Sequence, residues 1–191
     1  MPILRRHKSN CEVFEAQMHR WIALGMGDDR DFMRLMPLVR GTKRFLLIPR
    51  YSYAEHFASL IKSINVNAQK GVDLFEDNLI RDTAKCGRAY VALDFDDGKL
   101  GIDRSARAIC KELTRKERLP SSAFEGLAHL LLVPQAAPPA SLWVLGGSYC
   151  GTRDYKAAVL SEPGRIVFAD IDGAISYRDT AVASCSRRLS M

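Results

Sequence analysis

The sequence predicts an α+β fold, with N-terminal helices, a central strand-helix layer and a C-terminal antiparallel meander packed on helices. Three observations carry this prediction. Apolar residues recur at helical spacing over residues 10–40. Two short apolar runs, at residues 45–48 and 88–95, have the length of buried strands. Three further β-rich runs, all within residues 141–185, are separated by turn residues.

Residues 10–40 predict a hairpin of two helices. The first begins near Asn10 and ends at Gly25, and the second runs from Asp28 or Asp29 to about residue 39. Such a pair can act as an interaction arm, so we expect that a protein partner or a second copy of the chain could bind to it. The apolar stripe on the first helix is typical of core packing or of packing against a partner helix. It consists of Val13, Phe14, Gln17, Met18, Trp21 and Leu24.

The next segment predicts one strand followed by one helix. The strand at residues 45–48 stops at Pro49. Ser52 and Glu55 then have the spacing of a capping box, which predicts a helix running to about Ile64. A strand that leads into a helix in this way suits a layered α/β arrangement.

Two more helices follow the predicted strand at residues 88–95. A basic amphipathic helix is expected over about residues 103–118. A second capping box, made by Ser122 and Glu125, predicts the start of an apolar helix that continues to about residue 132.

The C-terminal meander is predicted from alternating strand and turn signals. Pro163 and Gly164 suit the central positions of a type II turn. Asp172-Gly173 is a second tight-turn signal. The expected strands are residues 142–145, 156–160 and 165–171, with a possible fourth at 174–178.

These elements divide the chain into four parts. The two ends carry basic residues and no expected element, so both are predicted to be tails. The parts are a basic flexible tail (1–9), the helical hairpin (10–40), an α+β domain (41–186, or one domain together with the hairpin) and a second tail (187–191).

Composition indicates a soluble protein of the cytosol. The 191 residues suffice for one domain that can fold without disulfide bonds or bound metal ions. No apolar run has the roughly 20 residues of a membrane span, and the opening M-P-I-L-R-R-H-K lacks the apolar core of a secretory signal. We therefore expect a cytoplasmic location, no membrane contact and five reduced cysteines. No C-x-x-C pair occurs, so we expect no zinc site and no cofactor.

The formal net charge of +6 is concentrated at the two ends. Arg5, Arg6 and Lys8 near the start, and Arg187 and Arg188 near the finish, leave about +1 for the rest of the chain. Solvated termini explain this distribution simply. Phosphate contacts by the tails and by the basic helix at 104–118 are the alternative, and they would be sequence-independent and strongly salt-dependent.

The loops of the meander are the predicted position of a ligand site, because polar side chains gather there at strand ends. Cys150 follows two glycines and Ser148, a context that lets a nucleophile protrude. His129 or His56 would then be the base, although a histidine on an apolar helix is more typical of a core. The predicted ligand-binding residues are Ser148, Arg153, Asp170 and Asp172, and the catalytic candidates are Cys150, Ser148 and His129.

Asp94 and Asp96 are the only candidates for a metal or for an acid/base pair of carboxylates. They lie two apart on a predicted strand, so they would share one face. A strand end that turns into solvent explains both residues equally well, and no histidine lies nearby in sequence. We expect no metal site.

A series of short motifs resembles an uncharacterised bacterial family known only as a domain of unknown function, over about residues 11–186. The resemblance implies a single compact intracellular domain and names no reaction. The motifs are F-x-x-Q at 14–17, L-G at 24–25, Y-V-A-L-D-F-D-D-G at 90–98, R-L-P-S-S-A-F-E-G-L-A at 118–128, G-S-Y-C-G-T-R at 147–153 and A-S-C at 183–185.

The last segment departs from that family. The family is richer there in Trp, Gly and His, with G-W-C-W and N-P-H-T-W-L-G patterns. This chain reads I-V-F-A-D-I-D and A-I-S-Y-R-D-T-A at the corresponding places. Any role of the family's histidine therefore does not carry over.

The sequence favours a non-catalytic ligand- or protein-binding module, because no set of nucleophile, base and orienting group can be assembled from neighbouring signals. One alternative is a thiol- or serine-dependent enzyme that uses Cys150 or Ser148. The other is a nucleic-acid or phosphate-ligand binder that uses the basic tails and the helix at 104–118.

Overall fold

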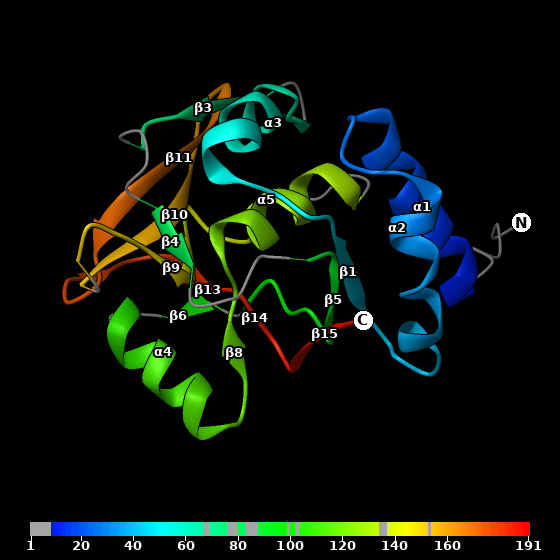
Figure 1. Ribbon diagram of the computed structural model, residues 1–191. Coiled ribbons are helices and arrows are strands. Elements are labelled where there is room, and N and C mark those ends of the chain that lie inside the picture. Colours follow the sequence, from blue (N-terminus) through cyan, green and yellow to red (C-terminus); the bar gives the residue numbers. More distant parts are fainter. Residues whose placement is uncertain are drawn as a thin grey trace, which may run out of the picture.

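Helix α5 (Ala123–Leu132) lies between the two main sheets and contacts both. On one side it packs against β1 (Phe45–Ile48), and on the other against β9 (Leu142–Cys150) (Figure 1). This computed structural model is a mixed α+β fold. It describes residues 9–66, 69–75, 80–82, 88–98, 100–101, 104–133, 137–152 and 154–191.

The predicted meander is confirmed as the centre of the larger sheet. β9, β10 (Tyr155–Glu162) and β11 (Arg165–Asp172) pair antiparallel in chain order. Gly164 has φ +78°, as the predicted turn between β10 and β11 requires. The sheet continues through β3 (Gln69–Asp73) and β2 (Asn65–Val66) on one side, and through β13 (Thr180–Val182) and β6 (Leu100–Gly101) on the other, while β4 (Ile80–Asp82) pairs with β9.

The fourth meander strand is not part of this sheet. Only β12 (Ser176–Tyr177) forms after the Asp172-Gly173 turn, and it pairs with β7 (Arg104–Ser105). The Asp172 carboxylate accepts a hydrogen bond from the amide of Ala174, which turns the chain out of the β11 register. The chain then returns as β13, parallel to β9.

A bulge interrupts β9 at Gly146, Gly147 and Ser148. Leu145 pairs with Ala157 of β10, but the next pair joins Tyr149 to Lys156. A Cβ on Gly147 would lie 2.4 Å from the carbonyl oxygen of Pro120, so only glycine allows this approach. The bulge presses β9 against the segment that leads into α5.

The second sheet joins three segments that are far apart in sequence. β5 (Tyr90–Leu93) lies at its centre, with β1 on one side and β15 (Arg187–Ser190) on the other, both antiparallel to it. The expected strands at 45–48 and 88–95 are thus confirmed. The prediction of a free tail at 187–191 is wrong, because residues 187–190 form this edge strand. Residues 1–8 of the other predicted tail lie outside the described residues.

Helix α1 (Asn10–Ala23) covers the outer edge of β1 and bonds to its backbone. The Gln17 amide donates to the Phe45 carbonyl and accepts from the Leu47 amide, as a neighbouring strand would. Trp21 Nε1 donates to the Leu47 carbonyl at 2.7 Å. The predicted apolar stripe therefore packs into the protein's own core, in one cluster with residues of both sheets.

The helix predicted to begin near Asn10 is capped one residue earlier, by Ser9. Ser9 caps the helix in a capping box with Glu12, and the Asn10 side chain instead donates to the carbonyls of Val39 and Thr42. These bonds hold α1 to the end of the second half of the hairpin. That half consists of α2 (Asp29–Met33) and a 3₁₀ turn (Met36–Val39) with Pro37 at its start.

The predicted capping box of Ser52 and Glu55 is absent. The chain instead forms a π turn, η2 (Tyr53–Phe57), before α3 (Ala58–Lys62), and the Ser52 amide donates to Nδ1 of His56. A π turn is a common feature of functional segments, because it redirects side chains within a helix.

Helix α4 (Ala106–Arg115) covers the opposite face of the larger sheet, where Ala106 packs with Val144, Ala158 and Val182. A short ladder between β8 (Leu119–Pro120) and β14 (Ser184–Cys185) then leads the chain into α5. The capping box of Ser122 and Glu125 is confirmed.

Glu125 has no exposed surface, and four donors satisfy its carboxylate. Arg188 of β15 approaches both oxygens, at 2.6 and 2.9 Å. Tyr90 of β5 donates at 3.0 Å, and the Ser122 amide donates at 2.8 Å. Burial alone would lower the pKa of Arg188, but the hydrogen bonds and charge of Glu125 outweigh it and raise that pKa, so Arg188 keeps its charge at neutral pH.

Replacing Arg188 by Met should destabilise the protein by about 3–5 kcal/mol, because the Glu125 carboxylate would stay buried without its cation. Urea unfolding measures the loss. Arg187→Met is the matched control, since Arg187 is exposed on the same strand, and it should change stability by no more than about 0.5 kcal/mol. The double variant Arg188→Met/Glu125→Met should be more stable than Arg188→Met alone. If Arg188→Met and Arg187→Met were equally stable, the stabilising role of the Arg188–Glu125 pair would be contradicted.

Replacing Gln17 by Met should cost about 2–4 kcal/mol, because the Phe45 carbonyl and the Leu47 amide would both lose their partner away from water. Glu15→Met on the exposed side of α1 is the control and should be nearly neutral. A Gln17→Met protein that unfolds at the wild-type urea concentration would show that α1 does not depend on these bonds.

Candidate functional site

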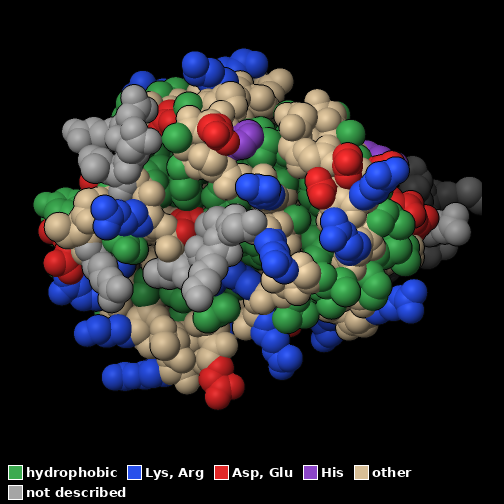
Figure 2. Space-filling model, in the orientation of Figure 1, with side chains coloured by type: hydrophobic (Ala, Val, Ile, Leu, Met, Phe, Trp, Pro, Cys, Tyr) green, Lys and Arg blue, Asp and Glu red, His purple; other side chains and the backbone are tan. Residues whose placement is uncertain are grey.

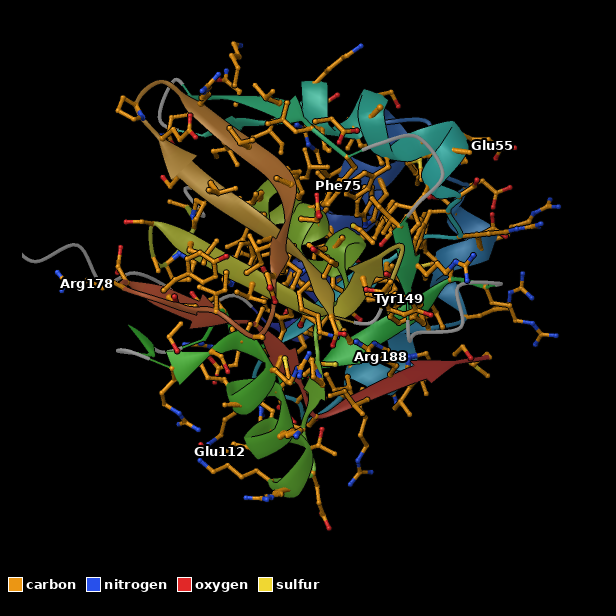
Figure 3. All side chains as sticks on the ribbon, turned by 90° about the vertical axis from the view of Figure 1, so that its left-hand side faces the viewer. Glu55, Phe75, Glu112, Tyr149, Arg178 and Arg188 are labelled. Atoms are coloured by element: carbon orange, nitrogen blue, oxygen red, sulfur yellow. The ribbon has the colours of Figure 1, made fainter. Side chains whose placement is uncertain are left out.

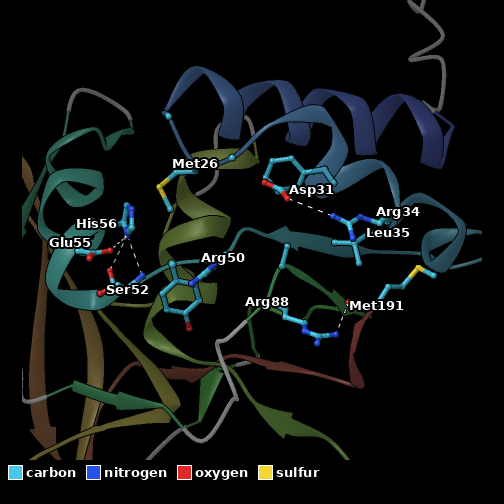
Figure 4. A pocket seen from close by; sticks show the side chains of 15 residues that line it. Met26, Asp31, Arg34, Leu35, Arg50, Ser52, Glu55, His56, Arg88 and Met191 are labelled. Carbon is cyan, nitrogen blue, oxygen red and sulfur yellow. Dashed lines mark hydrogen bonds and ion pairs between the residues drawn. The ribbon is translucent and has the colours of Figure 1, made fainter.

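A cavity of about 940 Å³ lies between the helical hairpin and the second sheet (Figure 4). We call it the cleft. Residues within 25–35, 50–56 and 88–89 line it, together with Met191. In Figure 2, Lys and Arg side chains border a hollow near the middle of the face in view. The cleft thus joins three segments that the sequence keeps apart.

One wall of the cleft is apolar and rigid. Phe32 and Leu35 from the α2 region are buried in the core, and Met26 lies on the turn before them. Tyr51 forms the floor and is 7% exposed. Its ring stacks on Phe124 of α5 with ring centroids 3.6 Å apart. These contacts fix the wall before any ligand arrives.

Three arginines from different elements also line the cleft. Arg34 follows α2, Arg50 follows β1, and Arg88 precedes β5. Arg34 approaches Asp31 at 3.8 Å, and Arg88 donates to the main-chain oxygen of Met191 at 3.4 Å. In the part of the chain that the structure describes, Arg50 has no hydrogen bond or ion pair. The cleft therefore contains positive charge that the protein does not neutralise.

His56 lies at the opposite end of the cleft from Arg34. Its Nδ1 accepts a hydrogen bond from the Ser52 amide at 3.1 Å and lies 3.8 Å from Glu55. Nδ1 also lies 3.3 Å from the main-chain oxygen of Ser52, and its role in that contact depends on the tautomer of the ring. His56 thus stabilises the start of the π turn and forms part of the wall of the cleft.

A polar cluster lies behind Tyr51 and ties the cleft to α5. Asp82 accepts hydrogen bonds from Tyr51 at 2.5 Å, from Tyr53 at 2.8 Å and from Ser148. Ser148 accepts from the Ala123 amide at 2.7 Å, so the positive end of α5 reaches the Asp82 carboxylate through the serine hydroxyl. The cluster holds the Tyr51 ring in place.

Among the described residues of the predicted ligand site, Ser148 is turned away from the meander loops. Ser148 has no exposed surface and points into the Asp82 cluster instead. Asp172 caps its own turn through Ala174, and Asp170 is exposed on β11. Arg153 lies outside the described residues. Ser148, Asp170 and Asp172 line neither the cleft nor a second cavity of about 350 Å³ between α4 and β13.

The environment of Cys150 is the reverse of the one that an activated thiol needs. Burial, with a smaller contribution from the charge of Asp170, raises the pKa of the Cys150 thiol to about 12. Burial likewise raises the pKa of Cys185 to about 12 and that of Cys110 to about 11. These three thiols are therefore protonated at neutral pH.

His129 is a core residue in the structure. Its ring stacks on Phe95 at 5.1 Å and meets the edge of Trp143 at 5.6 Å. Burial lowers the pKa of His129 to about 4, so the ring is neutral at pH 7. The helical rise places it roughly 9 Å along α5 from Ala123, the partner of Ser148. It is not positioned to act on Ser148.

The structure does not place Asp94 and Asp96 on one face of a strand. β5 ends at Leu93, and Asp94 turns the chain with φ +48°, so the alternation expected of a strand fails. Asp94 accepts a hydrogen bond from the Ser186 hydroxyl, and Asp96 accepts one from the Gly98 amide. Within the described residues, no group of three or more His, Cys, Asp or Glu side chains could hold a metal ion.

Part of the positive charge of the 104–118 segment is paired with the protein's own carboxylates. Glu112, on the outer side of the helix in Figure 3, pairs with Arg104 at 2.7 Å and with Lys116 at 2.5 Å. These two partners lower the pKa of Glu112 to about 2. Arg107 pairs with Asp154. These pairs reduce the positive charge that the segment would offer to a phosphate backbone.

Sequence reasoning did not predict the cleft. Its arginines stand next to strands, since Arg50 follows Pro49 at the end of β1 and Arg88 stands two residues before β5. Strand ends are a usual place for functional side chains. That signal was available, but the sequence gives no indication that these two strands are neighbours.

Alkylation of Cys150 by iodoacetamide should be slow at pH 7 and should still accelerate above pH 10, because little thiolate forms below its raised pKa. Peptide mass spectrometry over a pH series measures the rate, with the exposed Cys11 as internal reference. Asp170→Asn should accelerate the reaction modestly by removing the negative charge that opposes the thiolate. A Cys150 that reacts faster than Cys11 at pH 7 would contradict this picture.

None of the helices that the structure describes is long and apolar enough to cross a membrane. Comparison of the chain with protein-family models, with curated proteins and with solved structures gave no match. The assignment of function therefore depends on the geometry of the cleft.

Proposed function

We propose that the protein is a non-catalytic module that binds a small organic ligand in the cleft. The observation that carries this proposal is the cavity itself, whose volume of about 940 Å³ falls at the upper end of the range of known ligand pockets. One wall of the cleft is apolar, and its other lining residues include charged and polar side chains that can orient a ligand.

The cleft is also preorganised, which favours binding. Tyr51 is fixed by its stacking on Phe124 and by its bond to Asp82. Phe32 and Leu35 belong to the main core. Because these side chains are already ordered, a ligand would lose less free energy to ordering the protein on binding.

The described residues support binding over catalysis. The Ser148 hydroxyl is bonded to a carboxylate and to the α5 amide and has no exposed surface. Cys150 has a raised pKa, and His129 is enclosed by aromatic rings. No specific observation favours the enzyme alternative or the nucleic-acid alternative.

Two earlier expectations stay predictions. A partner on the helical hairpin would have to use the surface that faces away from β1, because the apolar stripe is already packed. A cytosolic location rests on the cysteines, which are simplest to explain as reduced thiols.

Screening small organic acids, alcohols and amines by protein-observed NMR should reveal ligands that shift the amides of Gly25 and Gly27, which lie at the mouth of the cleft. Ala89→Trp should abolish these shifts by filling the cavity. Ala174→Trp makes the same substitution on an exposed turn outside the cleft and should leave them intact. Ligands that bind Ala89→Trp as well as the wild type, or a screen without any ligand, would overturn the proposal.

A further inference from the structure

Building on the proposed function, we infer that the ligand is an organic phosphate, held by arginines at the rim of the cleft and by its apolar wall. Arg50 is the first reason. Its side chain borders the cavity, and no carboxylate pairs with it in the described part of the chain. An arginine beside a cavity presents a fork of N–H donors whose natural partner is a phosphate or carboxylate oxygen.

Arg88 and Arg34 extend the cationic rim. Arg88 faces the same cavity from the segment just before β5, and it donates to the main-chain oxygen of Met191 at 3.4 Å. Arg34 is 3.8 Å from Asp31, and both side chains are more than half exposed. Such exposed pairs are weak, so an incoming anion can compete for Arg34.

The acidic side chains of the cleft do not cancel this charge at Arg50. Asp31 lies beside Arg34, and Glu55 lies 3.8 Å from His56 at the other end. Asp31 and Glu55 therefore interact with Arg34 and His56, and neither pairs with Arg50.

Phosphate fits this rim better than carboxylate does. Arg34, Arg50 and Arg88 line the cavity from separate elements, and an anion with several strong acceptor oxygens can accept from donors that approach from different directions. A phosphate monoester offers three strongly accepting oxygens and up to two negative charges, whereas a carboxylate offers two oxygens in one plane. Met26, Phe32 and Leu35 border the cavity but are only 5%, 0% and 2% exposed, so an organic body on the phosphate would meet a small apolar surface there.

Isothermal titration with four matched probes tests the inference: phenyl phosphate, benzoate, benzyl alcohol and inorganic phosphate. Phenyl phosphate should bind most tightly, because it alone combines the dianion with an apolar ring. Arg50→Gln should weaken phenyl phosphate at least about tenfold, as expected when one hydrogen bond between charged groups is lost. Benzyl alcohol should bind this variant as it binds the wild type.

Two further variants test whether the guanidinium group of Arg50 binds the phosphate. Arg50→Lys keeps the charge but loses the fork, so its affinity for phenyl phosphate should fall between those of the wild type and Arg50→Gln. Arg165→Gln is the control, since Arg165 is an exposed arginine paired with Glu162 on the β10–β11 turn, outside the cleft. It should leave all four affinities unchanged. Arg50 is itself exposed, so its variants should keep the wild-type unfolding transition, which circular dichroism verifies.

The outcomes separate this inference from the proposed function. If benzyl alcohol binds as well as phenyl phosphate and Ala89→Trp abolishes both, the cleft binds ligands but the organic phosphate is wrong. If inorganic phosphate binds as tightly as phenyl phosphate, the apolar wall has no role and the inference again fails. If no probe binds and the small-molecule screen is also empty, the inference and the proposed function fail together.

Discussion

A buried negative charge organises this fold. Moving a carboxylate away from water costs several kcal/mol unless cations and hydrogen-bond donors surround it. Glu125 meets that requirement by drawing donors from β15, from β5 and from the turn before α5. The same requirement fixes the start of α5 relative to the second sheet. Phe124, the neighbour of Glu125, then supplies the surface on which Tyr51 stacks, so the floor of the cleft is set by the same turn of helix.

Local signals in the sequence predicted most of the elements, and they failed where a distant group decided the outcome. The meander, the strands at 45–48 and 88–95 and the capping box at Ser122 all follow from periodicity and turn chemistry within a few residues. Ser52 has the same local pattern as Ser122, yet His56 takes its amide and the turn becomes a π turn. Residues 187–190 look like a tail, because nothing nearby shows that β5 lacks a neighbour and that Glu125 lacks a cation.

The candidate site was harder to predict than the fold. Ser148 follows two glycines, which is also the pattern of an exposed nucleophile. Here the glycines serve a close backbone approach to Pro120, and the serine turns inward. The cleft depends on which segments become neighbours in space, and Arg34, Arg50 and Arg88 share no motif. A single sequence indicates residue types and local geometry, whereas the convergence of three distant arginines is a property of the tertiary packing.

The position of Arg188 has a consequence for how the chain is made. It lies 63 residues after Glu125, the group that it neutralises. During synthesis α5 leaves the ribosome well before β15 does. In that interval the Glu125 carboxylate lacks the guanidinium group with which it is paired when buried in the folded protein. The nascent chain can form the N-terminal hairpin early, because α1 and β1 are close in sequence. The central helix, however, can settle between its two sheets only after β15 has emerged, which makes the docking of α5 a late step of folding.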